Sequence, residues 1–376
     1  MQELEQLIVE TIRRQGPLTF ARYMETALYY PDLGYYMKDR EQFGEEGDFV
    51  TAPNLSPLLG RALAETVYDA WCALGRGQLR LVEYGPGRGE MMRDILGYLA
   101  AEYPELYDGL AAVLVEVSPA LAACQRRTLA SVPGEPGKVT WGDVPDDRRD
   151  TVVLANEFVD ALPFHRVRMG SGGLVELYVG EKDGRLIWVE GSPSSPAVAG
   201  FLTQSGLVLP EGHCAEVCLA AGEWLDETAR WVDRGFLLVV DYGMEAVSLF
   251  SPARAGGTVR SFRRHQLVED PLVDPGQQDI TAHVNFSALA NRGREAFGQP
   301  AGYTTQGRFI MHAGILEKLA KGDSYVFDPS RHQLAEQLKM LTLPGGMGEI
   351  FKVMAFYRGE GPVPALRGMA GGSWPV

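Results

Sequence analysis

From residue 79 onward, stretches with the hydrophobic pattern of strands alternate with stretches that have the pattern of helices. The predicted order is strand 79–84, helix 90–102, strand 110–117, helix 119–129, strand 139–141 and strand 151–155. Strands joined through helices usually lie parallel, with right-handed crossovers. The apolar run 235–241 is typical of another buried parallel strand, and 349–357 alternates as a strand does. The chain therefore predicts an α/β fold with a mostly parallel, Rossmann-like sheet.

Three further regions do not fit this alternation. Short strands separated by Gly-rich turns at 164–190 predict an antiparallel insertion, and 244–285 is rich in loops. The aromatic segment 20–57, which Gly and Pro interrupt, predicts a cover over the bound ligand. The predicted division is an N-terminal cover at 1–75, a Rossmann-like domain at 76–160, 235–243 and 286–376, and inserted substrate-recognition segments at 161–234 and 244–285.

The charge and hydropathy of the chain argue against several classes of partner. Its 376 residues can bury a large core, and 45% hydrophobic with 22% charged residues is ordinary for a folded protein. A formal net charge of −14 argues against a nucleic-acid substrate, because phosphate-binding surfaces are basic. No apolar run is long enough for a membrane span. The acidic N-terminal segment lacks the apolar stretch of a secretory signal, so we expect a cytoplasmic protein of unspecified oligomeric state.

The four cysteines do not predict a disulfide framework or a metal site. They are Cys72, Cys124, Cys214 and Cys218, which are too few and too scattered to stabilise the fold through disulfide bonds. His213 precedes Cys214, but a second pair that would complete a structural zinc site is missing. We therefore expect no metal and interpret the cysteines as buried or partly buried thiols.

The most informative motif is Glu83-Tyr-Gly-Pro-Gly-Arg-Gly-Glu90, which joins a predicted strand to a predicted helix. Glycine permits a tight turn and a close approach of the backbone to a ligand, and the helix start presents free N–H groups. The G-x-G-x-G spacing differs from the G-x-G-x-x-G of dinucleotide-binding turns, which disfavours an NAD-dependent oxidoreductase. Because Glu83 could face a cationic group, the motif suits the methionine end of S-adenosyl-L-methionine.

Polar residues also follow the next three predicted strands. An acid at Glu116 can hold ribose hydroxyls, and Gly142-Asp143 places another acid where it can accept from an adenine amino group. Asn156-Glu157 follows the fourth strand, beside the expected position of the sulfonium methyl. Because ligands bind at the carboxyl ends of parallel strands, these positions predict one site. The predicted cofactor-binding residues are Asp48, Thr51, Pro53, Glu83, Gly85, Pro86, Gly87, Gly89, Glu116, Ser118, Gly142, Asp143 and Asn156.

Longer motifs are spread nearly from end to end of the chain. They are ALYYP (27–31) with GYY (34–36), GDFVTAP (47–53), the glycine motif (83–89), ANEFVDALP (155–163), DYG (241–243), DPL (270–272), PG (275–276), DITAHVNF (279–286) and GEIFKV (348–353). These motifs resemble the MidA-like methyltransferases, whose mitochondrial members assist respiratory complex I assembly. The chain departs from that family at Val159, where an aromatic residue is common, and at Asn285, where an acid is common.

The resemblance implies a class I methyltransferase fold with S-adenosyl-L-methionine as cofactor, bound with the help of Gly85 and Gly87. The mitochondrial relatives are protein arginine methyltransferases, so the resemblance implies methyl transfer to an arginine of a protein partner. Two alternatives stay open. The chain could be a cofactor-binding assembly factor with little turnover, or a methyltransferase that acts on a small molecule.

Three residues are the predicted catalytic groups. Glu157 and Asp160 lie three residues apart, so both would face one pocket if residues 157–160 form a helical turn. Carboxylates there could orient a guanidinium, which stays protonated in water, for in-line methyl transfer. His283 is the third candidate, as proton acceptor or as a group that orients the substrate.

Overall fold

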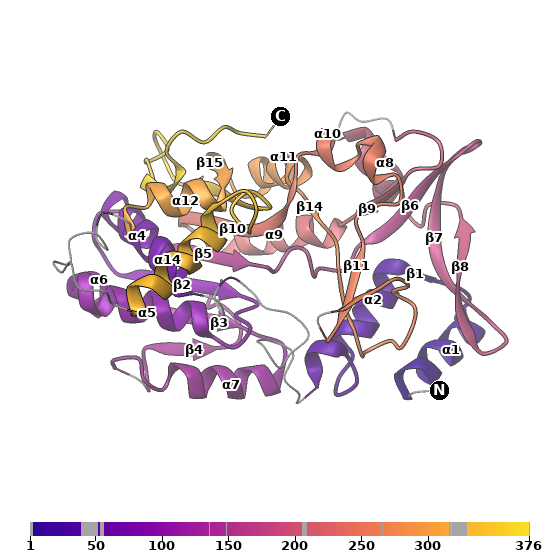
Figure 1. Ribbon diagram of the computed structural model, residues 1–376, viewed down its shortest axis with the longest axis horizontal. Helices are drawn as coiled ribbons and strands as arrows, with labels where there is room; N and C mark the ends of the chain where they lie inside the picture. The colour runs from indigo at the N-terminus through magenta and orange to yellow at the C-terminus, as the bar shows by residue number, and fades with distance from the viewer. Residues whose placement is uncertain are drawn as a thin grey trace. The chain divides into compact units, whose positions relative to one another are not determined.

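The predicted strands that alternate with helices, together with 235–241 and 349–357, lie in one sheet in the structure, a computed structural model (Figure 1). Its strands pair in the order β15-β16-β10-β5-β2-β3-β4. Their bounds are Leu79–Tyr84 (β2), Leu110–Val115 (β3), Val139–Trp141 (β4), Asp150–Asn156 (β5), Arg234–Met244 (β10), Gln299–Thr305 (β15) and Phe351–Arg358 (β16). Neighbours from β4 to β10 are parallel, whereas β16 and β15 join antiparallel. The predicted mostly parallel α/β fold is thus confirmed.

The structure describes residues 3–38, 52, 56–134, 136–147, 149–204, 209–264, 266–315, 317 and 329–375. The chain divides into two units. The sheet unit comprises Val50–Val159, Leu225–Gly243 and Ala290–Val376. The accessory unit comprises Met1–Phe49, Asp160–Trp224 and Met244–Leu289.

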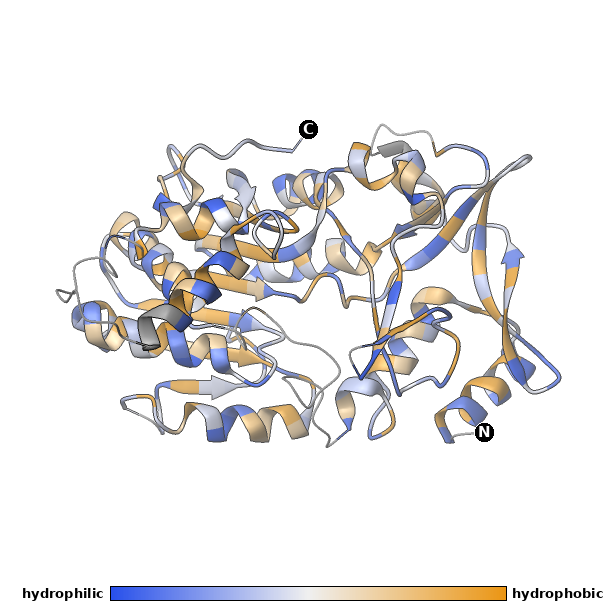
Figure 2. Ribbon diagram, in the orientation of Figure 1, coloured by the Kyte–Doolittle hydropathy of each residue, from blue (hydrophilic) through white to orange (hydrophobic). Residues whose placement is uncertain are grey.

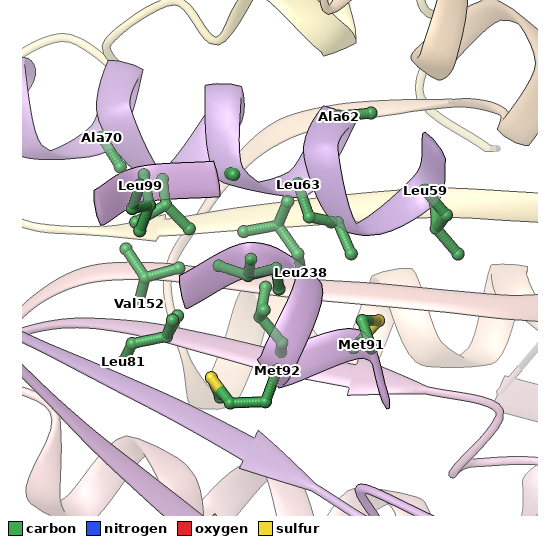
Figure 3. Packing of buried hydrophobic residues seen from close by; sticks show 14 of the residues in the cluster. Leu59, Ala62, Leu63, Ala70, Leu81, Met91, Met92, Leu99, Val152 and Leu238 are labelled. Atoms are coloured by element: carbon green, nitrogen blue, oxygen red, sulfur yellow. The ribbon is translucent and has the colours of Figure 1, made fainter. Parts of the chain in front are cut away.

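The core of the sheet unit forms between the central strands and the helices that cover them. Hydrophobic residues run along these strands in Figure 2. Leu63 of α4 (Leu58–Ala73) and Met92 of α5 (Glu90–Glu102) are fully buried in this core. Figure 3 shows them packed with residues of β2, β5 and β10, namely Leu81, Val152 and Leu238. The strands read as continuous apolar runs because both of their faces are covered.

Helix α4 explains how the observed division differs from the predicted one. The predicted N-terminal segment ran to residue 75, but α4 buries its apolar side against the sheet and belongs to the sheet unit. Other helices of this unit connect or flank its strands: α6 (Pro104–Asp108), α7 (Pro119–Leu129), α12 (Gln306–His312), α14 (Pro329–Thr342) and the short η3 (Arg367–Met369). Helices α9 (Leu219–Trp231) and α11 (Phe286–Ala296) start in the accessory unit and end in the sheet unit.

The accessory unit contains the predicted antiparallel insertion. Its larger sheet pairs β1-β7-β6-β9, with β8 on β7. The bounds are Leu18–Thr19 (β1), His165–Gly170 (β6), Gly173–Lys182 (β7), Arg185–Gly191 (β8) and Cys214–Val217 (β9). The region 244–285, which reads as loops, also holds a small sheet of Arg260–Arg263 (β11), Gln266–Val268 (β12) and Asp279–Thr281 (β13). These strands are too short and too polar for a period of two to stand out in the sequence.

The N-terminal aromatic residues form part of the accessory unit's own core. Helix α2 (Phe20–Tyr29) buries Phe20 and Tyr23 completely, and Tyr35 of η1 (Tyr35–Met37) is buried as well. These side chains pack with Phe164, and Tyr23 donates a hydrogen bond to a backbone oxygen of the same unit. The remaining elements are α1 (Glu3–Gln15), α8 (Pro196–Gln204), α10 (Ala246–Leu249), η2 (Pro252–Arg254) and β14 (Val284–Asn285). That segment 20–57 covers the cofactor stays a prediction.

Candidate functional site

The glycine-rich turn between β2 and α5 has a backbone that only glycine adopts easily. Gly85, Gly87 and Gly89 have φ angles of 60°, 53° and 83°. Residues other than glycine are rare in this left-handed region. A Cβ atom on Gly85 would also lie 3.0 Å from the ring of Phe158, which leaves little room for any larger residue. The turn leads directly into α5, and the N-terminus of a helix is a common binding place for a ligand.

Glu83, the penultimate residue of β2, is a buried carboxyl group with an unmatched oxygen. Its side chain is 2% exposed, and its Oε2 accepts no hydrogen bond from the described part of the chain. Burial, together with the nearby charge of Glu116, raises the pKa of Glu83 to about 8. A cationic ligand group would therefore find an acceptor there, and it would favour the ionised form of Glu83.

Glu116, directly after β3, accepts hydrogen bonds on both oxygens of its carboxylate. The backbone N–H of Ser118 donates to Oε1 at 2.8 Å, and Nε2 of Gln125 donates to Oε2 at 2.8 Å. Burial raises the pKa of Glu116, while these two donors act in the opposite direction. The Ser118 hydroxyl caps α7 by accepting from the Leu121 N–H, so that hydroxyl has a structural partner.

The ends of the parallel strands bring the predicted cofactor residues to one edge of the sheet. In the register of the sheet, Tyr84 lies opposite Val115 on β3 and Ala155 on β5. Gly142 follows β4 and donates its N–H to Leu114 on β3. Asp143, next to it, is exposed at the same edge. Asp48, Thr51 and Pro53, the remaining predicted cofactor residues, lie outside the described residues.

The turn after β5 has an unusual backbone. Glu157 has a φ of 49°, a left-handed conformation that is uncommon outside glycine. Its N–H donates to the Val240 oxygen at 2.9 Å, and its carboxylate accepts from Nδ2 of Asn156 at 3.4 Å. The other amide atom of Asn156, Oδ1, is buried without a hydrogen-bond partner among the described residues. A strained residue held by its surroundings points to a functional position.

Buried Asp241 lies in β10, three residues before the strand ends, and supports this turn from the neighbouring strand. It is fully buried, and its carboxylate accepts from the N–H of Val159 at 3.0 Å and from its neighbour Tyr242 at 2.8 Å. Residues 157–160 therefore do not form the helical turn that would make Glu157 and Asp160 face one pocket. The positive φ of Glu157 is incompatible with a right-handed helix, and the chain forms an irregular turn instead.

Asp160 and His283 belong to the accessory unit, where backbone contacts connect their segments. The N–H of Ala282 donates to the Asp160 carbonyl oxygen at 3.2 Å, and the His283 N–H donates to Oγ1 of Thr258 at 3.2 Å. Burial and the charges of Arg260 and Arg254 lower the pKa of His283 to about 4, so its imidazole is neutral at neutral pH. Glu157 lies in the sheet unit, so its cooperation with these two residues stays a prediction.

Two supporting residues escaped the sequence analysis. Gln125 occupies the buried stripe of α7 between Leu121 and Leu129, and a polar residue at such a position is the signal that could have revealed it. Asp241 belongs to the DYG motif at 241–243, but the motif did not reveal that this fully buried acid of β10 supports the neighbouring turn. No group of three or more His, Cys, Asp or Glu side chains in the described ranges could hold a metal ion. None of the described helices has the length and apolar character required to cross a membrane.

The unmatched acceptors fit the predicted cofactor. S-adenosyl-L-methionine carries an ammonium group and a ribose diol, all of them hydrogen-bond donors. Glu83 Oε2 and Asn156 Oδ1 are buried acceptors to which no described residue donates. Buried polar atoms normally have partners, and the donors of such a cofactor would supply them at this edge of the sheet.

Comparison with known proteins agrees with this site. Residues 62–304 match the family described as "Putative S-adenosyl-L-methionine-dependent methyltransferase". The chain is 33% identical over 373 residues to "Protein arginine methyltransferase NDUFAF7, mitochondrial" of Danio rerio, covering 90% of this chain and 82% of that protein. The Homo sapiens protein of the same name is also 33% identical over 373 residues, covering 92% of this chain and 81% of its own length.

A crystal structure from Burkholderia thailandensis resembles the whole chain. It contains bound S-adenosylhomocysteine, is 36% identical in sequence, and has a TM-score of 0.88 over 98% of this chain and 95% of that one. A second crystal structure from the same organism gives a TM-score of 0.85 at 36% identity, over 98% of this chain and 94% of that one. Both support the mixed α/β fold, and the first supports the cofactor.

Proposed function

The chain belongs to this family of S-adenosyl-L-methionine-dependent methyltransferases, and from that premise we propose that it methylates an arginine side chain of a protein partner. Relatives that are 33% identical over most of the chain are named protein arginine methyltransferases. The observation that carries the proposal is the carboxylate of Glu157, held on a strained backbone directly after β5. A negative group at this strand end matches a cationic acceptor.

Positioning is the main task of the protein in such a reaction. The cofactor supplies an electrophilic methyl group, and transfer requires the acceptor nitrogen to lie in line with it. Glu157 accepts hydrogen bonds from the guanidinium and orients it, because a carboxylate binds the planar N–H groups of arginine in a defined geometry. Val240 and Asp241 hold the backbone on either side of Glu157, so its carboxylate is placed before the acceptor arrives.

The substitution Glu157→Gln tests this role, because it keeps the size of the side chain and removes its charge. We expect affinity for S-adenosylhomocysteine to stay within about twofold, and methyl transfer to fall by roughly 10²–10³, the usual effect of losing an electrostatic contact in the transition state. Transfer is measured with radiolabelled donor and a protein extract of the source organism, and the labelled residue is then identified. The control is Glu105→Gln, which removes an exposed carboxylate on α6.

Each outcome of this experiment separates the proposed function from an alternative. Label on a residue type other than arginine, or only on small molecules, contradicts the proposed acceptor. Cofactor binding without any label favours an assembly factor with little turnover. Weakened cofactor affinity in Glu157→Gln would transfer Glu157 to the cofactor site. The same assay with Asp160→Asn and His283→Gln tests the other two predicted catalytic residues.

The location of the protein in the cell is a separate prediction. The names of the relatives describe mitochondrial proteins, and they do not support the cytoplasmic location predicted for this chain. Cell fractionation of the source organism would test the location.

A further inference from the structure

Gln125 is a polar side chain buried completely in the middle of α7. It shares the inward face of that helix with Leu121 and Leu129, which are one turn away on either side. An amide buried among apolar residues is costly unless its donors and acceptor have partners. The hydrogen-bond partners of Gln125 therefore indicate its role.

The amide group uses its oxygen and both of its hydrogens. Nε1 of Trp141, at the end of β4, donates to Oε1 at 3.0 Å. Nε2 donates to Oε2 of Glu116 at 2.8 Å and to the carbonyl oxygen of Gly87 at 2.8 Å. The indole N–H is only a donor, so it fixes which end of the amide faces Trp141 and directs both hydrogens toward Glu116 and Gly87.

The same helix also packs closely on the glycine turn. A Cβ atom on Gly89 would lie 3.3 Å from Cγ of Gln125 and 3.4 Å from its Cα. Any larger residue at position 89 would push α7 away and lengthen the amide's hydrogen bonds. The absence of a side chain at Gly89 thus allows Gln125 to reach Gly87.

We propose that Gln125 is a positioning residue of the cofactor site, whose single amide holds the Gly87 turn, the Glu116 carboxylate and the Trp141 ring in the arrangement that receives S-adenosyl-L-methionine. It contacts three segments that end neighbouring strands and that the sequence predicts to contact the methionine, ribose and adenine parts of the cofactor. Because protein donors already orient both oxygens of the Glu116 carboxylate, a ribose diol would meet an acceptor that is held in place before it binds. The proposal rests on the cofactor of the family and is independent of the arginine acceptor.

If the proposal holds, two substitutions that roughly keep the size of Gln125 change the pH dependence of cofactor affinity in opposite directions. Gln125→Met removes the donor to Glu116, so the pKa of Glu116 rises further and its ionised form becomes scarcer. The loss of affinity relative to the unchanged protein should then shrink as pH increases. Gln125→Glu places a second carboxyl group beside Glu116. It can donate while protonated but repels Glu116 once both are ionised, so its loss of affinity should grow as pH increases.

Other charged groups near Glu116 must be considered in this comparison. Glu83 on β2 acts on Glu116 through its charge and itself has a pKa of about 8. Arg126 of α7 lies over the Trp141 ring at 4.0 Å, and Asp143 follows β4. All three remain unchanged in the variants, so the ratio of each variant's Kd to that of the unchanged protein isolates the effect of position 125.

The experiment is calorimetric titration of the full chain with S-adenosylhomocysteine between pH 6 and pH 9. We expect Gln125→Met to weaken binding about tenfold at pH 7, as is typical for a lost hydrogen bond to a charged group. Trp141→Phe, which removes only the donor that orients the amide, should weaken binding less. The matched control is Leu129→Val, one turn along the same buried face, which lowers the melting temperature without touching the amide.

The result that supports the proposal is the pair of opposite pH trends, with Leu129→Val binding as the unchanged protein does. Unchanged affinity in Gln125→Met would overturn it. The proposal also fails if both Gln125 variants lose affinity to the same degree at every pH and only in proportion to their melting temperatures. Such a pattern would mean that Gln125 merely stabilises α7. If Glu116→Gln bound normally, the inference about Gln125 would fail while the arginine proposal stood.

Discussion

The turns after β2 and after β5 lie at the same edge of the sheet, and each has a glutamate at or beside its strand end. After β2, glycines adopt the left-handed conformations, so the backbone turns without strain. After β5, Glu157 itself adopts a left-handed conformation although glycine would adopt it more easily. The first turn is suited to a closely approaching ligand, whereas the second retains a carboxylate despite its conformational cost. The difference suggests that the first turn binds the cofactor and the second acts on the acceptor.

The largest effect should come from filling the space in the first turn. In Gly85→Val the backbone would keep a φ near 60° only under strain, and the new side chain would collide with the Phe158 ring. We expect a folded but less stable protein whose binding of S-adenosylhomocysteine is too weak to detect by calorimetry. The control is Gly97→Ala in α5, where a Cβ meets no atom within 4 Å and alanine favours the helix. Normal cofactor affinity in Gly85→Val would contradict the assignment of this turn.

A smaller effect is expected when the charge of the first turn's glutamate is removed. Burial keeps Glu83 protonated up to a pKa of about 8, whereas in the unfolded chain it ionises near 4.5. The free energy of unfolding of the unchanged protein should therefore fall as pH rises from 4.5 to 8, because the unfolded chain releases this proton and the folded chain retains it. Glu83→Gln does not lose stability in this way. At pH 8 it should be more stable than the unchanged protein by an amount on the order of a few kcal/mol.

The same variant should bind the cofactor on the order of tenfold more weakly, because the cationic ammonium loses an ionised partner. Binding to the unchanged protein near pH 7 should release a proton, which calorimetry in buffers of different ionisation enthalpy detects. Chemical denaturation from pH 4.5 to pH 8 measures the stability difference, with Glu105→Gln as control. Equal stability of the two proteins across this pH window would show that Glu83 is not held protonated.

The smallest effect concerns the strain in the second turn. Glu157→Gly relieves a left-handed conformation that costs a non-glycine residue about 1 kcal/mol, although the more flexible unfolded chain offsets part of this gain. We expect the free energy of unfolding to rise by up to about 1 kcal/mol while methyl transfer is lost. Denaturant titration and the transfer assay measure the two effects. A less stable variant with normal transfer would mean that the second turn serves the fold and not the acceptor.

Much of the site could be predicted from neighbouring residues in the chain. The glycine motif, Glu83 and the acids after the next strands are readable because each lies within a few residues of a strand end, and parallel strands align those ends. The conformation of residues 157–160 could not be predicted, because it does not depend on neighbouring residues alone. It depends on Val240 and Asp241 in a strand about eighty residues away, which spacing within the motif does not reveal.

The sequence by itself determined the alternation of strands and helices in the parallel sheet and the acids that follow its strands, since hydrophobic period and glycine spacing are local properties. Only the tertiary structure decided which buried polar groups meet. Gln125 is 38 residues from Gly87 in the chain, and Asp241 is 82 residues from Val159. Their hydrogen bonds exist only after the sheet has brought distant strand ends together, and no local pattern specifies which donor will then face which acceptor.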